Sequence, residues 1–548
     1  MEDFIVNKKA ITPLILLCLM STSIALQGAT IFVPDDYPAI QDAIDAAVSG
    51  DEIIVKPGTY PENIDYDGKA ITVKSEQGPE VTIIDPTYSS AVVRFWDDEG
   101  PGSILDGFTL KNGKGIYDFF TQQRLGGGIY CDDSSPTIRN NIITENSVSS
   151  MAAAGGGIYC NNSSPLIENN KIVGNQSGKY GGGIFCENNS APIIENNLIS
   201  ENTTIWSGGG ISLDYSPATV TGNVITKNDG GEVGGGIDCM GSSVTVNDNI
   251  ITNNICNDWG GGVFSLWCTI RMTNNVIARN SAGQDGGGVH CGGDCGSPRL
   301  TNNTIVENTA GSSGGGLCCD DDISLQVANT IMWQNTAALG PQIALTGAYS
   351  FPTVNISYSD AQGGQTQAYV APGSTLNWGA GMLDSDPMIV GVTINDWHII
   401  HYSPCKDAGN NNAPLTPSED FEGDPRTDST VDIGADEFHP HLYFTGSLEP
   451  GGRFDVRICG EPNTSPVTLA RGPSLQDPPQ STLYGDLYLQ PPFTTWNFGM
   501  LPTTGILVRP ATVPSHWQSG DEAYFQVLLG PQGNPSSILT NLAILYVE

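Results

Sequence analysis

The sequence predicts an all-β protein whose main part is a parallel β-helix, a chain wound into stacked coils of short strands. The 548 residues include 67 Gly and 35 Pro, and only 15% are charged, unlike a helical protein rich in Ala, Glu, Lys and Leu. A glycine-rich segment recurs many times at a nearly constant spacing, which is typical of solenoids. The apolar runs between these segments are too short for helices.

Each repeat begins with three glycines followed by Ile, Val or Leu. Eight such blocks, 26 to 29 residues apart, start at Gly126, Gly155, Gly181, Gly208, Gly234, Gly260, Gly286 and Gly314. Three short strands and three turns fill one repeat, so we predict one coil per repeat and about 11–13 coils in all. A leucine-rich-repeat horseshoe has a similar period, but the Leu-dominated frame that it needs is missing.

Two asparagine columns follow the glycine blocks. The first contains Asn141, Asn170, Asn197, Asn223, Asn249, Asn275, Asn303 and Asn329, and the second Asn146, Asn175, Asn202, Asn228, Asn254, Asn280, Asn308 and Asn335. Asparagine tolerates left-handed backbone in tight turns. Amides stacked coil on coil at about 4.8 Å also bond to one another, so we expect turns joined by amide ladders.

Alternation of inward and outward residues assigns the interior of the strand that follows each glycine block. A recurring inward position holds Cys131, Cys160, Cys186, Cys239, Cys291 and Cys319. An exported protein can form disulfides, but parallel side chains in adjacent coils suit the dihedral angle of a disulfide poorly. We favour buried thiols over a zipper of disulfides.

Residues 1–25 are expected to be a signal peptide cleaved near Ala25. Lys8 and Lys9 precede an apolar run, Ala10 to Met20, about half the roughly 20 residues that cross a bilayer as a helix. An uncleaved anchor is the alternative. No later stretch is long and apolar enough for a membrane span, so we expect a secreted, extracellular or cell-surface protein.

The net charge is −37, from 22 Lys and Arg against 59 Asp and Glu. Nucleic-acid binders need a basic surface to displace phosphate counterions, so this class is excluded. Binding to anionic membrane surfaces is disfavoured for the same reason.

The rest of the chain divides into four expected parts: an N-terminal cap with the first coils (26–125), regular repeats (126–340), last coils with a closing segment (341–439) and a β-sandwich (440–548). Residues 37–47 have the apolar spacing of a helix, which we interpret as the cap over the open end of the coils. Beyond residue 440, short alternating runs between Pro and Gly turns predict the sandwich.

Several motifs outside the repeats carry a resemblance. They are Ile40-Gln41, Gly50-Asp51, Pro57-Gly58-Thr59-Tyr60 and Glu62-Asn63 near the start, and Ser403–Gly409, Gly423–Arg426 and Val431–Glu437 near the end. With the repeats, the chain resembles the pectin-lyase-like superfamily of right-handed parallel β-helices from about residue 30 to 437. The end is similar to bacterial surface proteins of the choice-of-anchor Q type, which carry no agreed enzymatic activity. The superfamily also includes polyuronate lyases and glycoside hydrolases.

The best catalytic candidates are Glu168, Glu195 and Arg139. They occupy one outward position in three successive coils, so the two carboxylates lie about 5 Å apart by coil stacking, and one would have a raised pKa. A charged ladder on a solvated face explains the same residues. Because repeat lengths vary by only three residues, no loop is expected to wall a substrate cleft.

Three aromatic residues, Tyr130, Tyr159 and Phe185, follow one another at an outward position of successive coils. Such a stack is a candidate platform for sugar rings. A ladder that only shields the sheet is the alternative.

Five acids of the closing segment are candidate Ca²⁺ ligands, because Ca²⁺ prefers several oxygen ligands. They are Asp420, Glu422, Asp424, Asp432 and Asp436. A solvated acidic loop is the alternative, and no cofactor other than this Ca²⁺ is predicted.

Two functions remain open from the sequence. The regular coils favour a non-catalytic glycan-binding, adhesive or structural module, whose partner would be an extracellular polysaccharide or a cell-envelope component. The resemblance and the Glu168–Glu195 pair favour a polysaccharide lyase or glycoside hydrolase. The sequence predicts no oligomeric state.

Overall fold

The computed structural model describes residues 28–119, 122–149, 152–293, 296–347, 350–391, 396–426 and 430–439 with their side chains. From residue 441 on, it describes only the backbone of strands β48 (His441–Gly446) to β57 (Ala543–Tyr546). The predicted signal peptide lies outside the described residues. Among the described helices, none is long and apolar enough to cross a membrane.

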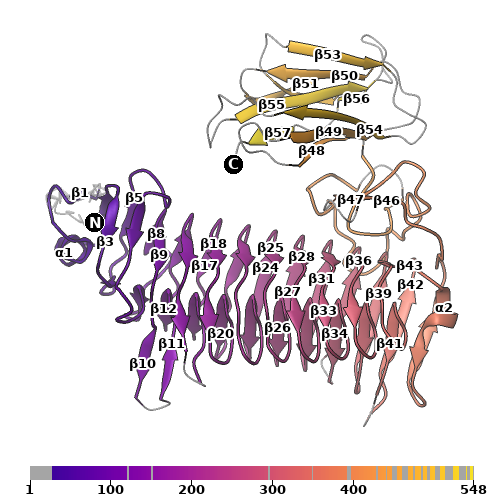
Figure 1. Ribbon diagram of the computed structural model, residues 1–548, viewed down its shortest axis with the longest axis horizontal. Coiled ribbons are helices and arrows are strands. Elements are labelled where there is room, and N and C mark those ends of the chain that lie inside the picture. Colours follow the sequence, from indigo (N-terminus) through magenta and orange to yellow (C-terminus); the bar gives the residue numbers. More distant parts are fainter. Residues whose placement is uncertain are drawn as a thin grey trace, which may run out of the picture.

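Three parallel sheets form the body, and each coil adds one strand to each of them (Figure 1). Sheet A has 14 strands in the order β1 (Thr30–Val33), β2 (Glu52–Val55), β5 (Thr72–Ser75), β8 (Ile104–Asp106), β13 (Thr137–Arg139), β17 (Leu166–Glu168), β21 (Ile193–Glu195), β24 (Ala218–Thr221), β27 (Ser243–Asn247), β31 (Thr269–Thr273), β35 (Arg299–Thr301), β39 (Ser324–Ala328), β42 (Thr353–Ser357) and β45 (Thr375–Trp378).

The other two sheets have 12 strands each. Sheet B contains β3 (Gly58–Tyr60), β6 (Thr82–Ile84), β9 (Thr109–Lys111), β14 (Ile142–Thr144), β18 (Lys171–Val173), β22 (Leu198–Ser200), β25 (Val224–Thr226), β28 (Ile250–Thr252), β32 (Val276–Ala278), β36 (Thr304–Val306), β40 (Ile331–Trp333) and β43 (Asp360–Ala361). Sheet C contains β4 (Ile64–Asp65), β7 (Val93–Phe95), β12 (Ile129–Asp132), β16 (Ile158–Asn161), β20 (Ile184–Glu187), β23 (Ile211–Asp214), β26 (Ile237–Met240), β30 (Val263–Leu266), β34 (Val289–Gly292), β38 (Leu317–Cys319), β41 (Ile343–Leu345) and β44 (Tyr369–Val370).

The interior follows the predicted alternation. Ile129, Ile158 and Ile184 pair in register and are fully buried. The cysteine position beside them stacks in the same way, and Cys131, Cys160 and Cys186 are buried thiols outside any disulfide. The prediction of thiols is confirmed for this column.

The asparagine columns form amide ladders inside the coils. In the first ladder, Asn170 Nδ2 donates to Asn197 Oδ1 over 3.1 Å, and in the second, Asn175 Nδ2 donates to Asn202 Oδ1 over 3.0 Å. The left-handed turn residue is the one before the first ladder, such as Asn196 with φ of 56°. The assignment of Asn329 to this ladder was wrong, because Asn329 has φ of 48° and occupies that turn position.

Between sheets B and C the regular coils bulge into an arch, residues 175–181 in one repeat. Short strands stack along it: β15 (Ser147–Val148) with β19 (Gln176–Ser177), and β29 (Ile255–Cys256) with β33 (Ser281–Ala282) and β37 (Thr309–Ala310). A row of parallel bridges, from Leu125 through Ala154, Tyr180 and Ser207, runs along the returning side of the arch. The arch therefore covers the outward face of sheet C.

Helix α1 (Ile40–Ala46) lies at the N-terminal end of the solenoid (Figure 1). Its Ile40, Ala43 and Ile44 are fully buried in the core. Both oxygens of Glu62 accept N–H groups at the helix start, from Ile40 and Gln41 over 2.9 Å each. A carboxylate at this end satisfies free N–H groups and matches the helix dipole.

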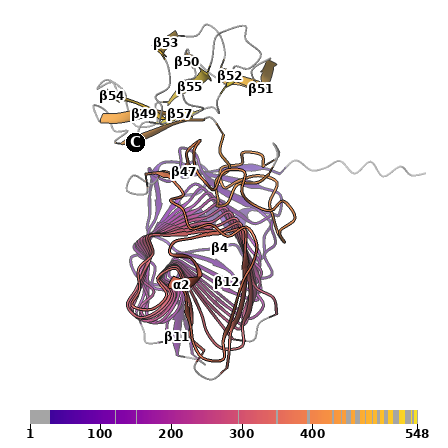
Figure 2. The ribbon, with the colours of Figure 1, turned by 90° about the vertical axis from the view of Figure 1, so that its right-hand side faces the viewer.

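The closing segment does not continue the coils. After β45, strands β46 (Ile389–Gly391) and β47 (Asp396–Ile399) lead into a segment that runs back outside the solenoid (Figures 1 and 2). We call residues 396–426 and 430–438 the strap. Its Trp397, Ile399 and Ile433 pack on the outer face of sheet B, against residues that include Val306 and Ile331.

Strands β48 to β57 pair antiparallel, in sheets of three, five and two strands. This pairing agrees with a β-rich C-terminal part. The packing of these sheets into a sandwich remains a prediction.

Candidate functional site

The predicted charged column exists, and it forms a ladder. Arg139 pairs in register with Glu168, and Glu168 with Glu195. Arg139 Nε donates to Asp106 Oδ2 over 2.9 Å, whereas Arg139 Nη1 is 4.0 Å from Glu168 Oε1. The guanidinium of Arg139 therefore pairs more closely with Asp106 than with Glu168. One basic and three acidic residues thus follow one another on a partly solvated face, and a catalytic role for them stays a prediction.

The predicted aromatic platform is not on the surface. Tyr130, Tyr159 and Phe185 do stack, with ring centroids 5.3 and 6.0 Å apart, but they are only 9%, 4% and 2% exposed. The physical reason is the arch, because a Cβ on Gly126 would lie 3.0 Å from Tyr130 Cβ. The expectation of a sugar platform there is corrected, since no ring face is open to a ligand.

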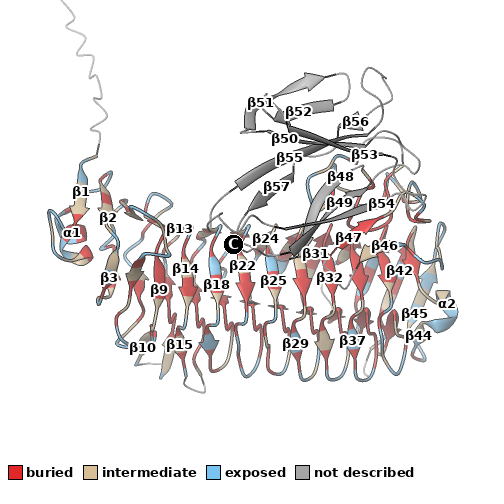
Figure 3. Ribbon diagram, turned by 45° about the horizontal axis from the view of Figure 1, so that its top comes forward, coloured by how far each residue is buried: buried red, intermediate tan, exposed pale blue. Residues whose placement is uncertain are grey.

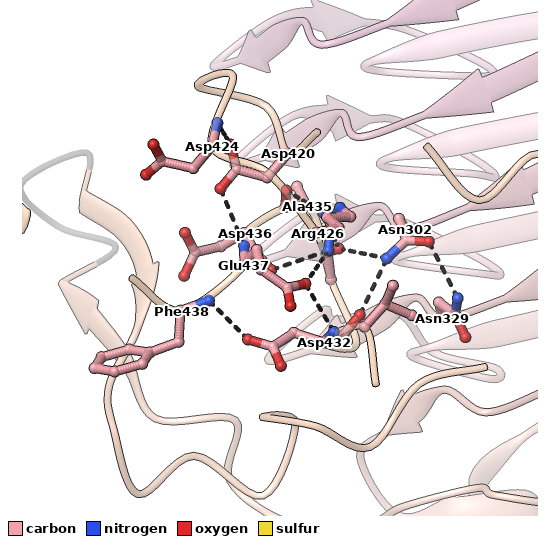
Figure 4. A network of polar contacts seen from close by, with 12 residues as sticks. Asn302, Asn329, Asp420, Asp424, Arg426, Asp432, Ala435, Asp436, Glu437 and Phe438 are labelled. Carbon is pink, nitrogen blue, oxygen red and sulfur yellow. Dashed lines mark hydrogen bonds and ion pairs between the residues drawn. The ribbon is translucent and has the colours of Figure 1, made fainter. Parts of the chain in front are cut away.

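The five acidic residues of the strap mostly bind its own backbone (Figure 4). Asp420 Oδ1 accepts the N–H groups of Glu422 and Asp424, and Asp432 accepts those of Asp407 and Phe438. Asp420, Asp432 and Asp436 are buried, so the strap is not a solvated acidic loop.

These five carboxylates also do not converge as a metal site would require. Within the described residues, the group of three or more acids whose oxygens all lie within 4.8 Å of one another is Asp65, Asp97 and Glu99, in the first coils. There, Glu99 accepts hydrogen bonds from the N–H groups of Gly68 and Asp97. A Ca²⁺ role for the strap acids stays a prediction.

Arg426 joins the strap to the solenoid, a role that the sequence motif around it did not reveal. Its guanidinium is buried and bonds Glu437 Oε2 at 2.9 Å and Asn274 Oδ1 at 3.1 Å (Figure 4). It also donates to the carbonyl oxygens of Gly434 and Ala435. Burial raises the pKa of Glu437 to about 7.

Three turn residues between sheets A and B also hold the strap. Asn274 Nδ2 donates to the carbonyl of Glu419 over 2.7 Å. Asn302 and Asn329 donate in the same way to the carbonyls of Asp432 and Asn410. The left-handed turns of these three coils thus point amides outward, and the amides bind the strap.

The strap walls a groove over sheet A, against the expectation that no segment would do so. One cavity of about 320 Å³ lies between the sheet and Leu415, Thr416 and Pro417. Its sheet side is lined by Thr245, Asn247, Asp248, Arg271, Thr273 and Asn274. Repeat lengths could not reveal this wall, because it comes from a distant part of the chain.

A second cavity of about 440 Å³ continues the first. The two share Asp248, Asn274 and Pro417, and the second reaches Asn196 on one side and Phe421 on the other. We call both together the strap groove. Its turn residues come from four successive coils, so it runs along the solenoid axis for about 14 Å at 4.8 Å per coil.

Both donors and acceptors of hydrogen bonds line the groove. Burial raises the pKa of Asp248, whose carboxylate accepts hydrogen bonds from Asn274 Nδ2 at 3.0 Å and Thr221 Oγ1 at 3.5 Å. Arg271 is exposed and pairs in register with Arg299 of the next coil. The Glu168–Glu195 pair lies outside, although Glu195 pairs with Thr221 at the groove's end.

Comparison with known proteins identifies the fold. The family model described as "Right handed beta helix region" matches residues 105–255. A solved structure of XylC with xylose shares 11% identity, covers 75% of this chain and 98% of its own, and has a TM-score of 0.46. The A-module of the mannuronan C-5 epimerase AlgE6 from Azotobacter vinelandii shares 15%, covers 63% and 93%, and has a TM-score of 0.27. No curated protein sequence matches this chain.

Scores this low carry no argument about this chain, so the activities of the two structures are not transferred. The closing segment's similarity to choice-of-anchor Q proteins finds no counterpart among the matches. The coils, the register of their sheets and the family match agree, and the protein is a right-handed parallel β-helix.

Proposed function

We propose that the protein is an exported glycan-binding module that holds a polysaccharide chain in the strap groove without cleaving it. The observation that carries the proposal is the groove itself, a channel parallel to the axis. Amide, hydroxyl, carboxylate and guanidinium groups line it, and these groups suit the many hydroxyls of a sugar chain.

The groove's chemistry favours binding over cleavage. Hydrolysis needs two facing carboxyls, about 5 Å apart for retention or 6.5–9.5 Å for inversion. Asp248 and Glu419 line the groove, while both oxygens of Asp420 accept backbone N–H groups. Asp248 is itself bonded to Asn274 and Thr221 of the sheet. Asp248 therefore serves as an acceptor for sugar hydroxyls in this proposal.

The test is a panel of soluble and insoluble polysaccharides, assayed with the chain from residue 26 to 548. We expect retention on at least one glycan, with no new reducing ends and no unsaturated products. Arg271→Ala should weaken binding about tenfold, because it removes a charged donor. Glu168→Gln is the matched control, since it changes a charged residue of the same sheet outside the groove.

Two outcomes would contradict the proposal. Absence of retention on every glycan, with and without Ca²⁺, would leave a structural or adhesive role. New reducing ends or unsaturated products that disappear in Asp248→Asn would make the protein a polysaccharide hydrolase or lyase.

A further inference from the structure

Two exposed aromatic residues, Tyr215 and Trp267, occupy the same turn two coils apart. The turn joins sheet C to sheet A, from β23 to β24 in one coil and from β30 to β31 in the other. In the coils between and beyond them, the same position holds Gly241 and Gly293. At this turn position, the coils next to each ring therefore carry no second ring.

Both aromatic residues have backbone that their side chains disfavour. Their φ angles are 47° and 54°, in the left-handed region. Large side chains adopt this region at a cost, and Gly or Asn is preferred there. Asn162 and Gly241 occupy this turn in other coils. Local backbone preference therefore does not explain an aromatic residue at either position.

Each ring lies across the glycine of the following coil. A Cβ on Gly241 would be 2.6 Å from Tyr215 Cε1, and a Cβ on Gly293 would be 2.2 Å from Trp267 Cδ1. The glycines thus make room for the rings and limit their motion. Even so, Tyr215 remains 59% exposed and Trp267 remains 54% exposed.

We propose that Tyr215 and Trp267 form a second binding site, separate from the strap groove, for a neutral β-1,4-linked polysaccharide lying along the axis. The two rings are two coils apart, about 10 Å at 4.8 Å per coil. One sugar unit of an extended β-1,4-linked chain advances by about the same distance as one coil. Alternate sugars of such a chain therefore reach both rings.

The surroundings suit a neutral chain. Stacking on an aromatic ring buries the apolar face of a sugar, as aromatic residues do at interfaces. The hydroxyl groups of Ser243 and Thr269 come next on the outward face of sheet A, in register in neighbouring coils. The net charge of −37 opposes a polyuronate over the long range.

The experiment is depletion by insoluble cellulose, xylan and mannan, with the chain from residue 26 to 548. The variants are Tyr215→Asn, Trp267→Asn and both together, because Asn occupies this turn at Asn162. Each single variant should bind about tenfold more weakly, and the double variant should not bind above background. The thermal midpoints should not fall, since Asn relieves the backbone.

Tyr88→Asn is the matched control, because Tyr88 is also an exposed tyrosine with left-handed backbone, in a distant coil. Its binding should equal that of the unchanged chain. The proposal is overturned if no neutral β-1,4-glycan is bound. It is also overturned if the variants bind normally but melt earlier. That result would mean that the rings only stabilise the fold, by packing on the glycine of the next coil. Arg271→Ala separates the two sites, because it weakens the groove and leaves the ring site unchanged.

Discussion

At the residue scale, the amide ladders show how a single side chain joins several coils. Asn197 Oδ1 accepts hydrogen bonds from the backbone N–H and the Nδ2 of Asn170. Its own Nδ2 donates to the carbonyl of Ile167 and to Asn223 Oδ1. The residue is buried, so water cannot replace these bonds.

Asn197→Ala is therefore expected to cost about 3 kcal/mol, since buried partners left unsatisfied cost about 1–3 kcal/mol each. A solenoid does not unfold as one unit, so the measurement is hydrogen exchange of the amides in the neighbouring coils. Gln176→Ala, an exposed amide of the preceding coil, should leave the exchange unchanged. Equal protection in both variants would contradict a stabilising role for the ladder.

His398 is the residue on which the strap's pH dependence should centre. Its Nδ1 lies 2.7 Å from Asp396 Oδ1 and its Nε2 lies 2.8 Å from Glu422 Oε2. Burial by itself lowers the pKa of His398, but the hydrogen bonds to Asp396 and Glu422 outweigh it and hold the pKa well above 6.5. Asp436 adds to this attraction.

A histidine whose pKa is raised on folding stabilises the fold fully below its unfolded value of about 6.5. This stabilisation is lost as the pH rises through the folded pKa. Burial also raises the pKa of Asp436, which acts in the same direction. Protease cleavage within the strap should therefore be faster at pH 9 than at pH 6.

His398→Gln should make this cleavage less dependent on pH, whereas His439→Gln, at a partly exposed position of the same segment, should not. If both variants keep the pH profile of the unchanged chain, the histidine does not control the strap.

At the element scale, the glycine block is required by the arch that folds over sheet C. Gly155 has φ of 68°, and a Cβ there would lie 2.6 Å from the carbonyl oxygen of Ile158 and 2.7 Å from Tyr159 Cβ. Gly174 has the same φ, but the nearest atom to a Cβ there is Thr144 Oγ1 at 3.9 Å. Substitution of Gly174 therefore tests backbone strain alone, whereas substitution of Gly155 adds steric conflict to the same strain.

Gly174→Ala should cost about 1–2 kcal/mol, the strain of left-handed backbone. Gly155→Ala should cost several times more, because its neighbours are backbone atoms and the Cβ of the buried Tyr159, which cannot move away. Thermal unfolding and hydrogen exchange of the two variants, compared side by side, give the answer. Equal losses would mean that the arch adjusts to a side chain.

At the scale of the whole molecule, the strap decides where the solenoid presents a groove. The strands β46 and β47, which lead into the strap, lie beside the last coils (Figure 3). The strap meets the turn residues of the last coils and, within the part of the chain that the structure describes, walls the outer face of sheet A there. Arg426 donates hydrogen bonds both to the strap's own backbone at Gly434 and to Asn274 of the solenoid, and so links the two.

Arg426→Ala should release the strap by removing the partner of the buried Glu437, a change that typically costs about 3–5 kcal/mol. Cleavage in the strap should accelerate, and retention on the groove's glycan should fall. Arg426→Lys should not restore either property, because an ammonium cannot make the same set of hydrogen bonds. Lys227→Ala, at an exposed ion pair, is the control and should behave like the unchanged chain.

The coils could be derived from the sequence because a repeat places like residues at like positions. The interior, the two ladders and the helix over the first coil all follow from local patterns, with one ladder position misassigned. The burial of Tyr130, Tyr159 and Phe185 could not be derived, because alternation says which way a side chain points and not what covers it.

The strap groove and the ring pair required the tertiary structure. The groove brings Asp248 next to Pro417, and Arg426 next to Asn274, across more than a hundred residues. The rings of Tyr215 and Trp267 were visible in the sequence, but their exposure and their spacing along the axis were not. The sequence by itself determined a solenoid, since stacking repeats needs only local periodicity. The tertiary structure decided which faces of that solenoid are open to a ligand, because covering a face depends on contacts between distant segments.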